Sequence, residues 1–536
     1  SWKKLQWPLA GAPEYSSPEG EFKLTGKLAD YKLNGGLRWV LAGAEQEGRL
    51  KLNGHGSTEA FELESLALSG APGTVNGQAN IIWAPALKLD AELRGKDVNP
   101  GAIIADWPGQ LDVHLLAHAE QKPEGLVAQV KKLQIDGQLR EQPLRIDARG
   151  RYAPKLSVIE QLKVVAGETR LLAQGQIAQK IDLTWSLDSS DLGTTLPSAE
   201  GEVRGNGRVT GTLKAPVVQA KLTGSGLRYV DYRLAQLDLD ANVDVSGANN
   251  SQLNLTMEGG LLNGVTLNSL ALNVDGTPSQ HNISLDADSS QGQAEIGVSG
   301  SLPKSMDRWE FVLRQARLEY PRLAPWTLAD SAAGLITADT QKLEQACWRS
   351  DDAKLCLQGR KNPKGTHAQF SLDDFGLAYL KPFLPQDLQL NGAVSGNGDV
   401  RLVDGAEPDV NVSLNTTVIE VITRDAEGEP FEALAFAPGT VTAQMGADGL
   451  QSTVNLPLAT GGGIQLDASV PAASAPLSER PLTGSIDVLL EDLSALPALV
   501  PEIERAEGEV RGNLAINGTL AAPQINGQVS LNAPVL

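Results

Sequence analysis

The chain has 536 residues, with 45 Lys and Arg against 65 Asp and Glu, which gives a formal net charge of −20. This acidic surplus argues against nucleic acid as a partner, because binding it needs clustered cations, and against a polybasic membrane anchor. Apolar residues make up 41% of the chain but aromatic residues only 4%, so we exclude a disordered chain and predict an interior of Leu, Val, Ile and Ala. No apolar run approaches the roughly 18 residues that cross a bilayer, and the first residues lack the apolar core of a signal peptide.

Four short segments along the chain carry the signals of a short helix or a turn between strands. The four segments are residues 97–109, 191–205, 374–396 and 492–512. In the last three we expect Asp191, Asp374 and Asp492 each to begin a short helix or turn, which a Pro ends before a new strand starts.

Strict alternation of apolar and polar residues is the commonest pattern. The clearest runs are residues 237–245, 270–275, 283–288 and 410–415. A period of two places successive side chains on opposite faces of a sheet, so each run predicts a strand with one aliphatic face. Asp238, Asp240 and Asp244 fall on the other face, which we interpret as solvated, with an acidic docking surface as the alternative.

Turn signals separate the runs. The dipeptides are Asn53-Gly54, Asp136-Gly137, Asn263-Gly264, Asp275-Gly276, Asp404-Gly405 and Asn517-Gly518. They supply the positive φ angles of tight hairpins. The sequence therefore predicts an all-β fold, an antiparallel meander with one aliphatic and one Asp/Asn-rich face.

An internal repeat links two distant parts of the chain. Residues 199–206 match residues 506–513 at all eight positions, and residues 211–213 match residues 518–520. Such repetition predicts stacked supersecondary units. Because their spacing is irregular and no boundary stands out, we predict that residues 1–536 form one continuous elongated body.

Motifs for catalysis or metal binding are not recognisable. His114 and His118 have the spacing of a helical metal pair, but their context is strand-like and no Glu follows His114, so we interpret them as surface or rim residues. The Gly-rich residues 205–207 and 461–463 lack the strand–helix context and the Lys of a phosphate loop. No Ser or Cys lies in a nucleophile elbow. We therefore predict no enzyme, no cofactor and no metal.

The two cysteines flank a probable hairpin. Cys347 and Cys356 stand on either side of a polar turn, which would bring the two thiols opposite each other. The alternative is a pair of reduced, small apolar side chains. We predict a disulfide, which requires an oxidising compartment such as the periplasm.

The joint order of these patterns resembles the TamB family of AsmA-like bridge proteins of Gram-negative bacteria. The segments that carry the resemblance are residues 2–9, 97–101 with 107–109, 201–216 and 518–527. The resemblance implies a periplasmic, long and curled β-sheet, a β-taco, whose apolar concave face guides phospholipid acyl chains between the inner and outer membranes. It also implies an N-terminal inner-membrane helix and a C-terminal domain that joins the barrel partner TamA, both outside this sequence, which would then be a middle periplasmic segment.

The alternating runs indicate which side chains would line that groove. They are Leu237, Leu239, Val243, Val245, Leu253, Leu255, Leu270, Leu272, Val274, Ile283, Leu285, Val410, Val412 and Leu414. Aliphatic walls bury acyl methylenes at about 0.8 kcal/mol each, and the contact is non-directional, so a lipid can slide along them. Two other hypotheses remain: a periplasmic scaffold that helps an outer-membrane barrel assemble or secrete proteins through exposed strand edges, and a passive fibre with a filled interior.

Overall fold

The computed structural model describes residues 1–7, 15–41, 47–70, 72–102, 104, 106–385, 388–403, 406–424, 430–473, 475–493 and 507–535. Strands dominate this part of the chain: 34 belong to one antiparallel sheet and three, β27, β30 and β31, to a second sheet. The predicted all-β fold with a long antiparallel sheet is confirmed. The chain divides into two compact units, Ser1–Thr277 and Pro278–Leu536, which we describe separately; that they form one continuous body stays a prediction. Among the described residues, no helix has the length and apolarity needed to cross a membrane.

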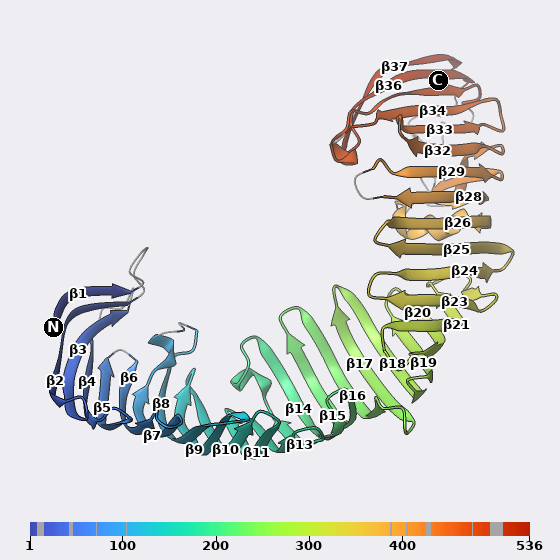
Figure 1. Ribbon diagram of the computed structural model, residues 1–536. Coiled ribbons are helices and arrows are strands. Elements are labelled where there is room, and N and C mark those ends of the chain that lie inside the picture. Colours follow the sequence, from blue (N-terminus) through green and yellow to red (C-terminus); the bar gives the residue numbers. More distant parts are fainter. Residues whose placement is uncertain are drawn as a thin grey trace. The chain divides into compact units, whose positions relative to one another are not determined.

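The first unit is a meander in which sequence neighbours pair (Figure 1). One-turn 3-10 helices, η1 (Pro100–Ala102) and η2 (Leu192–Thr194), mark two of its chain reversals. Its strands are β1 (Trp2–Trp7), β2 (Tyr15–Lys27), β3 (Asp30–Leu41), β4 (Gly48–Gly56), β5 (Ala60–Gly70), β6 (Gly73–Ile82), β7 (Lys88–Val98), β8 (Gly109–Lys122), β9 (Gly125–Leu139), β10 (Gln142–Ala153), β11 (Leu156–Ala166), β12 (Thr169–Ile177), β13 (Ile181–Ser189), β14 (Ala199–Thr212), β15 (Ala215–Tyr229), β16 (Tyr232–Asp244), β17 (Ser251–Leu262) and β18 (Val265–Thr277).

The second unit has the same meander with added layers. Its 3-10 helices are η3 (Leu377–Phe383) and η4 (Leu477–Glu479). The strands of its main sheet are β19 (Gln280–Ser289), β20 (Gly292–Ser301), β21 (Arg308–Glu319), β22 (Trp326–Leu328), β23 (Ala332–Thr337), β24 (Gln341–Ser350), β25 (Ala353–Asn362), β26 (Gly365–Gly376), β28 (Ala393–Leu402), β29 (Asp409–Thr416), β32 (Thr440–Gly446), β33 (Gly449–Pro457), β34 (Gly462–Pro471), β35 (Thr483–Leu490), β36 (Glu507–Thr519) and β37 (Ala522–Val535). The second sheet contains β27 (Gln389–Asn391), β30 (Ile419–Arg424) and β31 (Pro430–Phe436).

The alternating runs form strands that sort their side chains by polarity. In β16, Leu239 lies opposite Leu222 of β15 and Leu255 of β17. The next residue, Asp240, lies opposite Lys221. The period of two therefore gives each strand an aliphatic and a polar face, as predicted.

Four of the six predicted turns are wrong. Asn53-Gly54 lies inside β4, Asp136-Gly137 inside β9, Asp275-Gly276 inside β18 and Asn517-Gly518 inside β36. Only Asn263-Gly264 forms a hairpin turn, with φ values of 49° and 81°, and Asp404-Gly405 lies outside the described residues. Gly276 and Gly518 have φ values of 117° and 93°, which L side chains rarely adopt. Inside a strand such a glycine marks a bend, so the strands are longer and more curved than the turn signals predict.

The Asp-begun helices are confirmed in only one place. The Asp191 carboxylate caps η2 by accepting a hydrogen bond of 2.8 Å from the Gly193 amide. The prediction for Asp374 is wrong, because this residue lies in β26 and η3 begins only after Gly376, without a side-chain cap. The segment after Asp492 is outside the described residues from position 494 to 506.

The internal repeat encodes the same hairpin in both units. β14 and β36 end at the matching residues Thr212 and Thr519, and β15 and β37 begin at Ala215 and Ala522. In each hairpin the threonine hydroxyl accepts a hydrogen bond of 3.2 Å from the alanine amide. The prediction of recurring supersecondary units is thus met at this position; residue 506 itself lies outside the described part.

Buried apolar side chains concentrate in the second unit. Among the described residues of the first unit, the buried apolar ones are Leu111, Ala199, Ala241 and Leu267. In the second unit, one buried cluster joins Leu377, Ile419, Phe436 and Leu458. Another joins Val470, Leu482 and Ile516. The two units therefore share a meander but differ in what covers its aliphatic face.

Candidate functional site

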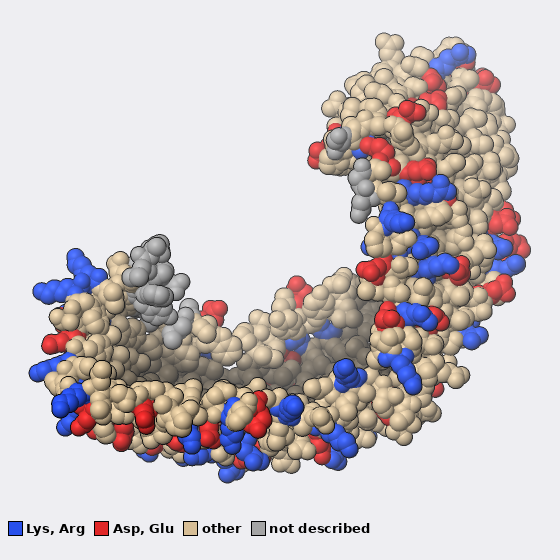
Figure 2. Space-filling view, viewed as in Figure 1, with Lys and Arg blue, Asp and Glu red and all other residues tan. Residues whose placement is uncertain are grey.

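The aliphatic face of the first unit is continuous from strand to strand. One row of directly opposed residues runs from β3 to β18 without a polar member. It consists of Leu37, Leu50, Leu68, Val75, Gly95, Val113, Ile135, Ile146, Val164, Leu171, Leu187, Gly205, Leu222, Leu239, Leu255 and Leu272. A second row runs beside it from β4 to β18 and contains Leu52, Leu66, Gly77, Leu93, Leu115, Leu133, Ala148, Leu162, Ala173, Trp185, Gly207, Ala220, Ala241, Leu253 and Val274. Figure 2 shows this unit hollowed on a side that is mostly free of charged residues, with Lys, Arg, Asp and Glu on its outside.

The fourteen side chains predicted to line the groove are all half-buried; none belongs to the buried core, and none is among the exposed large apolar residues. Leu239, Leu255 and Leu272 form one cross-strand row, and Leu253 and Val274 lie opposite each other in the next. The remaining predicted residues of this unit are Leu237, Val243, Val245 and Leu270, of which Val245 lies one residue beyond the end of β16. In the second unit, Ile283 and Leu285 lie on β19, and Val410, Val412 and Leu414 lie on β29.

Large side chains on this face lie across glycines of the adjacent strand. A Cβ atom added at Gly207 would lie 2.7 Å from the Trp185 indole nitrogen, and one added at Gly205 would lie 2.7 Å from a Leu222 methyl carbon. Because glycine has no side chain, the Trp185 and Leu222 side chains occupy the space where a Cβ atom of these residues would lie. The glycines and the large residues can be read from the sequence. Which glycine lies opposite which large residue is known only from the strand register.

The opposite face is polar and held by ion pairs between strands. The Lys221 ammonium lies 2.9 Å from Asp240, which raises the pKa of Lys221. The Arg208 guanidinium donates two hydrogen bonds of 2.9 Å to Asp182, which lowers the pKa of that carboxyl. These groups are exposed, so each pair contributes little to stability.

One residue predicted for the solvated face is instead buried. Asp244 is only 2% exposed and ends β16. Its carboxylate accepts hydrogen bonds from the Ser246 amide and hydroxyl and from the Asn249 amide and side chain. These bonds, chiefly that of the Ser246 hydroxyl, lower the pKa of Asp244. The prediction of an outward, solvated Asp244 is wrong, because the loop after the strand folds onto its carboxylate.

The histidine pair faces carboxylates on the polar side of β8. His114 Nε2 lies 3.1 Å from Glu92, and His118 Nδ1 lies 2.9 Å from Asp90. Both histidines therefore lie on a strand at the surface, as predicted. In the part of the chain that the structure describes, no three His, Cys, Asp or Glu side chains gather in a way that could hold a metal ion.

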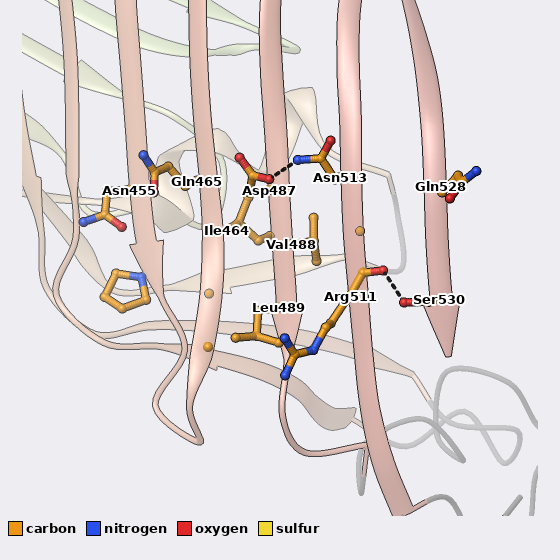
Figure 3. A pocket seen from close by; sticks show the side chains of 14 residues that line it. Asn455, Ile464, Gln465, Asp487, Val488, Leu489, Arg511, Asn513, Gln528 and Ser530 are labelled. Atoms are coloured by element: carbon orange, nitrogen blue, oxygen red, sulfur yellow. Dashed lines mark hydrogen bonds between the residues drawn. The ribbon is translucent and has the colours of Figure 1, made fainter. Parts of the chain in front are cut away.

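Hollows on the polar face offer a second kind of candidate site. Figure 3 shows the one near the C-terminal end, where a row of polar side chains crosses five strands. The row consists of Asn455, Gln465, Asp487, Asn513 and Gln528. The Asp487 carboxylate is already hydrogen-bonded by the Asn513 amide group. This hollow therefore offers partly satisfied polar groups on an open sheet surface, whereas the aliphatic face offers a continuous apolar path.

The two cysteines lie directly opposite each other on β24 and β25. The structure joins Cys347 and Cys356 in a disulfide, with their Cα atoms 4.0 Å apart. The neighbours Leu355 and Leu357 belong to the aliphatic face, so the disulfide lies on the polar face. The redox state of the protein in its compartment stays a prediction.

The structure thus defines a protein built on an antiparallel β-sheet, whose first unit has an uninterrupted apolar row on one face and ion pairs between strands on the other. The family described as TamB, N-terminal domain matches residues 1–531. The chain is also 21% identical over 523 residues to the translocation and assembly module subunit TamB of Haemophilus influenzae; the match covers 95% of this chain and 39% of that relative. The chain belongs to the TamB family, which confirms the resemblance seen in the sequence.

Proposed function

We propose that this chain is a periplasmic part of a bridge that carries phospholipids between the inner and outer membranes along its aliphatic face. The observation that supports this most is the unbroken row from Leu37 to Leu272, whose predicted lining members are only half-buried and do not belong to the core. An uncovered apolar face of this length is unfavourable in water and needs a partner. Acyl chains suit it because every strand offers them nearly the same contact.

Membership of the TamB family supports the location and the partners of this proposal. The relative from Haemophilus influenzae is named as a subunit of a translocation and assembly module. We propose that the full-length protein is anchored in the inner membrane and meets a TamA-like barrel at the outer membrane. No enzymatic step is needed for this role.

A scaffold for outer-membrane protein assembly is the second candidate, and the name of that relative favours it. Such a scaffold would bind unfolded barrel strands at sheet edges rather than lipids on the face. A filled fibre fits less well, because a filled interior would bury the predicted lining residues, which are half-exposed.

Lipid extraction and photo-crosslinking separate these functions. We expect phospholipids in organic extracts of the purified chain, and lipid adducts when a photo-reactive residue replaces Leu255. Extracts without lipid, together with no adduct at this position, would contradict the bridge. Adducts with unfolded barrel strands at β37 would favour the scaffold.

A paired substitution tests the face itself. Leu239→Arg places a charge on the acyl-chain path, and because Leu239 is half-exposed the long side chain can reach water without unfolding the strand. We expect an unchanged far-ultraviolet circular dichroism spectrum and loss of lipid supply to the outer membrane in cells that carry the substitution in the full-length protein. Asp238→Arg is the matched control, since Asp238 is exposed and lies opposite Thr223 and Thr256. Loss of fold in Leu239→Arg would favour a packed interior.

A further inference from the structure

In the second unit, one margin of the aliphatic face is roofed by a separate layer. We call this layer the cover: η3 together with β27, β30 and β31. Its side chains Leu377, Ile419 and Phe436 are buried, and they pack with Leu458, which directly follows β33. The main-sheet residues packed against this cluster are Val394, Leu456, Ile464 and Leu490. The cover therefore occupies the apolar margin where an acyl chain would otherwise lie.

The cover is fixed at both of its ends. The Tyr379 ring of η3 packs against Trp326 and Phe375, with ring centroids 5.3 and 5.4 Å apart. The Tyr379 hydroxyl donates a hydrogen bond of 3.0 Å to the Ala324 carbonyl. At the other end, the Ala459 amide donates a bond of 2.9 Å to the Ala435 carbonyl of β31. These contacts make the cover a wall of the unit.

The opposite margin is covered by a second segment, residues 476–482, which we call the strap. Its Leu482 is buried with Val470 and Ile516, and Leu450 packs against the same cluster. The strap is also held by an ion pair: the buried Arg480 guanidinium donates two hydrogen bonds to the Glu407 carboxylate, at 2.7 and 3.0 Å, although the two residues are 73 positions apart.

The cover and the strap leave a narrow apolar strip between them. On β33, Leu450 contacts the strap cluster and Leu456 contacts the cover cluster, while Ser452 and Val454 lie between them on the same face and are half-buried. The strip continues through Val441 of β32 and Leu414 of β29, the cross-strand neighbours of Val454. On β34 it closes, because Ile464 packs against the cover cluster and Leu466 against the strap cluster. Leu450 and Leu456 are about 20 Å apart along an extended strand, so the free strip is roughly one or two side-chain rows wide, about 7–14 Å.

The first unit has no such walls in its described part. On β17, Leu253, Leu255 and Met257 span the face, and all three are half-exposed. An acyl chain there can shift sideways from one row to the next. In the second unit the same shift would bring it against the cover or the strap.

We propose that the second unit is the selective constriction of the lipid path, and that Val441 and Val454 determine which acyl chains pass. This inference rests on the proposed function, since it assumes that lipids use the aliphatic face. A chain confined on three sides gains more contacts per methylene than one on an open face, so its shape and bulk matter more. The open first unit, by contrast, accepts lipids with little discrimination.

A photo-crosslinking scan across one strand of each unit tests this. A photo-reactive residue replaces Leu450, Val454 or Leu456 on β33, or Leu253, Leu255 or Met257 on β17, in the whole chain incubated with phosphatidylethanolamine–phosphatidylglycerol vesicles. We expect lipid adducts within about twofold of one another at the three positions on β17. On β33 we expect adducts at position 454 and about tenfold fewer at 450 and 456, where the probe should react within the protein.

The outcomes distinguish failure of the constriction from failure of the lipid bridge. Equal adduct yields at positions 450, 454 and 456 would overturn the constriction and leave the bridge intact. Absence of adducts at all three positions on β17 would overturn the proposed function and this inference with it.

A matched pair of bulky substitutions gives a second test. Val454→Trp should lower lipid adducts at Val441 about tenfold, because the strip offers no way around the ring. Leu255→Trp should change adducts at Leu239 by less than about twofold, because neighbouring rows remain open. Circular dichroism of each variant reports folding, and if Val454→Trp does not fold, the scan decides alone. Equal losses in the two units would overturn the constriction.

Discussion

The two units build the same aliphatic face and treat it differently. The first leaves rows of Leu, Val and Ile half-exposed from β3 to β18, whereas the second shelters both margins beneath a cover and a strap. The repeated hairpins β14–β15 and β36–β37 show that the difference does not arise in the meander, because their boundaries and threonine caps are the same. The alternation of apolar and polar residues forms the aliphatic face in both units. The cover and the strap, which are inserted in the second unit, determine how much of that face is sheltered.

The largest difference between the two units should be the loss of local stability when a buried aromatic ring is removed from the second unit. Phe436→Ala removes a buried side chain from the cover, which should cost about 3–5 kcal/mol in local stability. Leu255→Ala removes a half-exposed side chain from the first unit and should cost about 1 kcal/mol. Native-state hydrogen exchange of β30 and β17 measures both. Equal losses at the two sites would contradict the distinction between a packed cover and an open face.

The sequence predicts the sheet well because its signal is local. The period of two in residues 237–245 is enough to assign faces, and the structure places Leu239 and Asp240 accordingly. Turns were predicted less well, since Asp275-Gly276 and Asn517-Gly518 have the residues of a hairpin but bend a continuing strand. Glycine permits a positive φ wherever it occurs. Whether the chain reverses at that glycine depends on how the residues on either side of it pair with the neighbouring strands.

The cover could not be predicted, because it depends on which strands pair. Residues 419–424 resemble any other strand of the meander, yet β29 pairs with β32, and β30 joins the second sheet. The clamp between Arg480 and Glu407 is likewise invisible in the sequence, since it joins residues 73 positions apart. Asp244 shows the same limit: alternation places it outward, and the following loop buries it.

The next effect in size should come from the disulfide of the second unit. Closing the short loop between Cys347 and Cys356 should stabilise the β24–β25 hairpin by about 2–3 kcal/mol. Intact-mass analysis after alkylation should find two reactive thiols only after reduction of protein purified from the periplasm. The double substitution Cys347→Ser and Cys356→Ser should speed hydrogen exchange in β24 and β25 and leave β17 unchanged. Two thiols that alkylate without reductant would refute the disulfide.

A smaller, pH-dependent effect should follow loss of the strap clamp. The hydrogen bonds from Arg480 lower the pKa of Glu407, so this pair stabilises the strap fully above the ordinary Glu pKa, and the stabilisation is lost as the pH falls through the lowered value. Glu407→Gln should remove it at neutral pH and speed amide exchange in residues 476–482 about tenfold. Asp409→Asn, which alters an exposed pair on the same hairpin, is the control and should have no effect. Unchanged exchange in Glu407→Gln would show that packing alone holds the strap.

The smallest effect should come from the ion pairs of the polar face, where the first unit has many and the aliphatic rows have none. Lys221→Met breaks the 2.9 Å contact with Asp240, but both side chains are well exposed and screened by water. Because Asp240 raises the pKa of Lys221, the pair's contribution is complete below the ordinary Lys pKa and is lost only as the pH rises through the raised value. Between pH 5 and 9 we therefore expect a shift of the thermal midpoint of less than about 2 °C and unchanged lipid adducts at Leu239. A larger shift, or a loss of adducts, would mean that the polar face helps to hold the aliphatic face open, and the two faces could no longer be treated as independent.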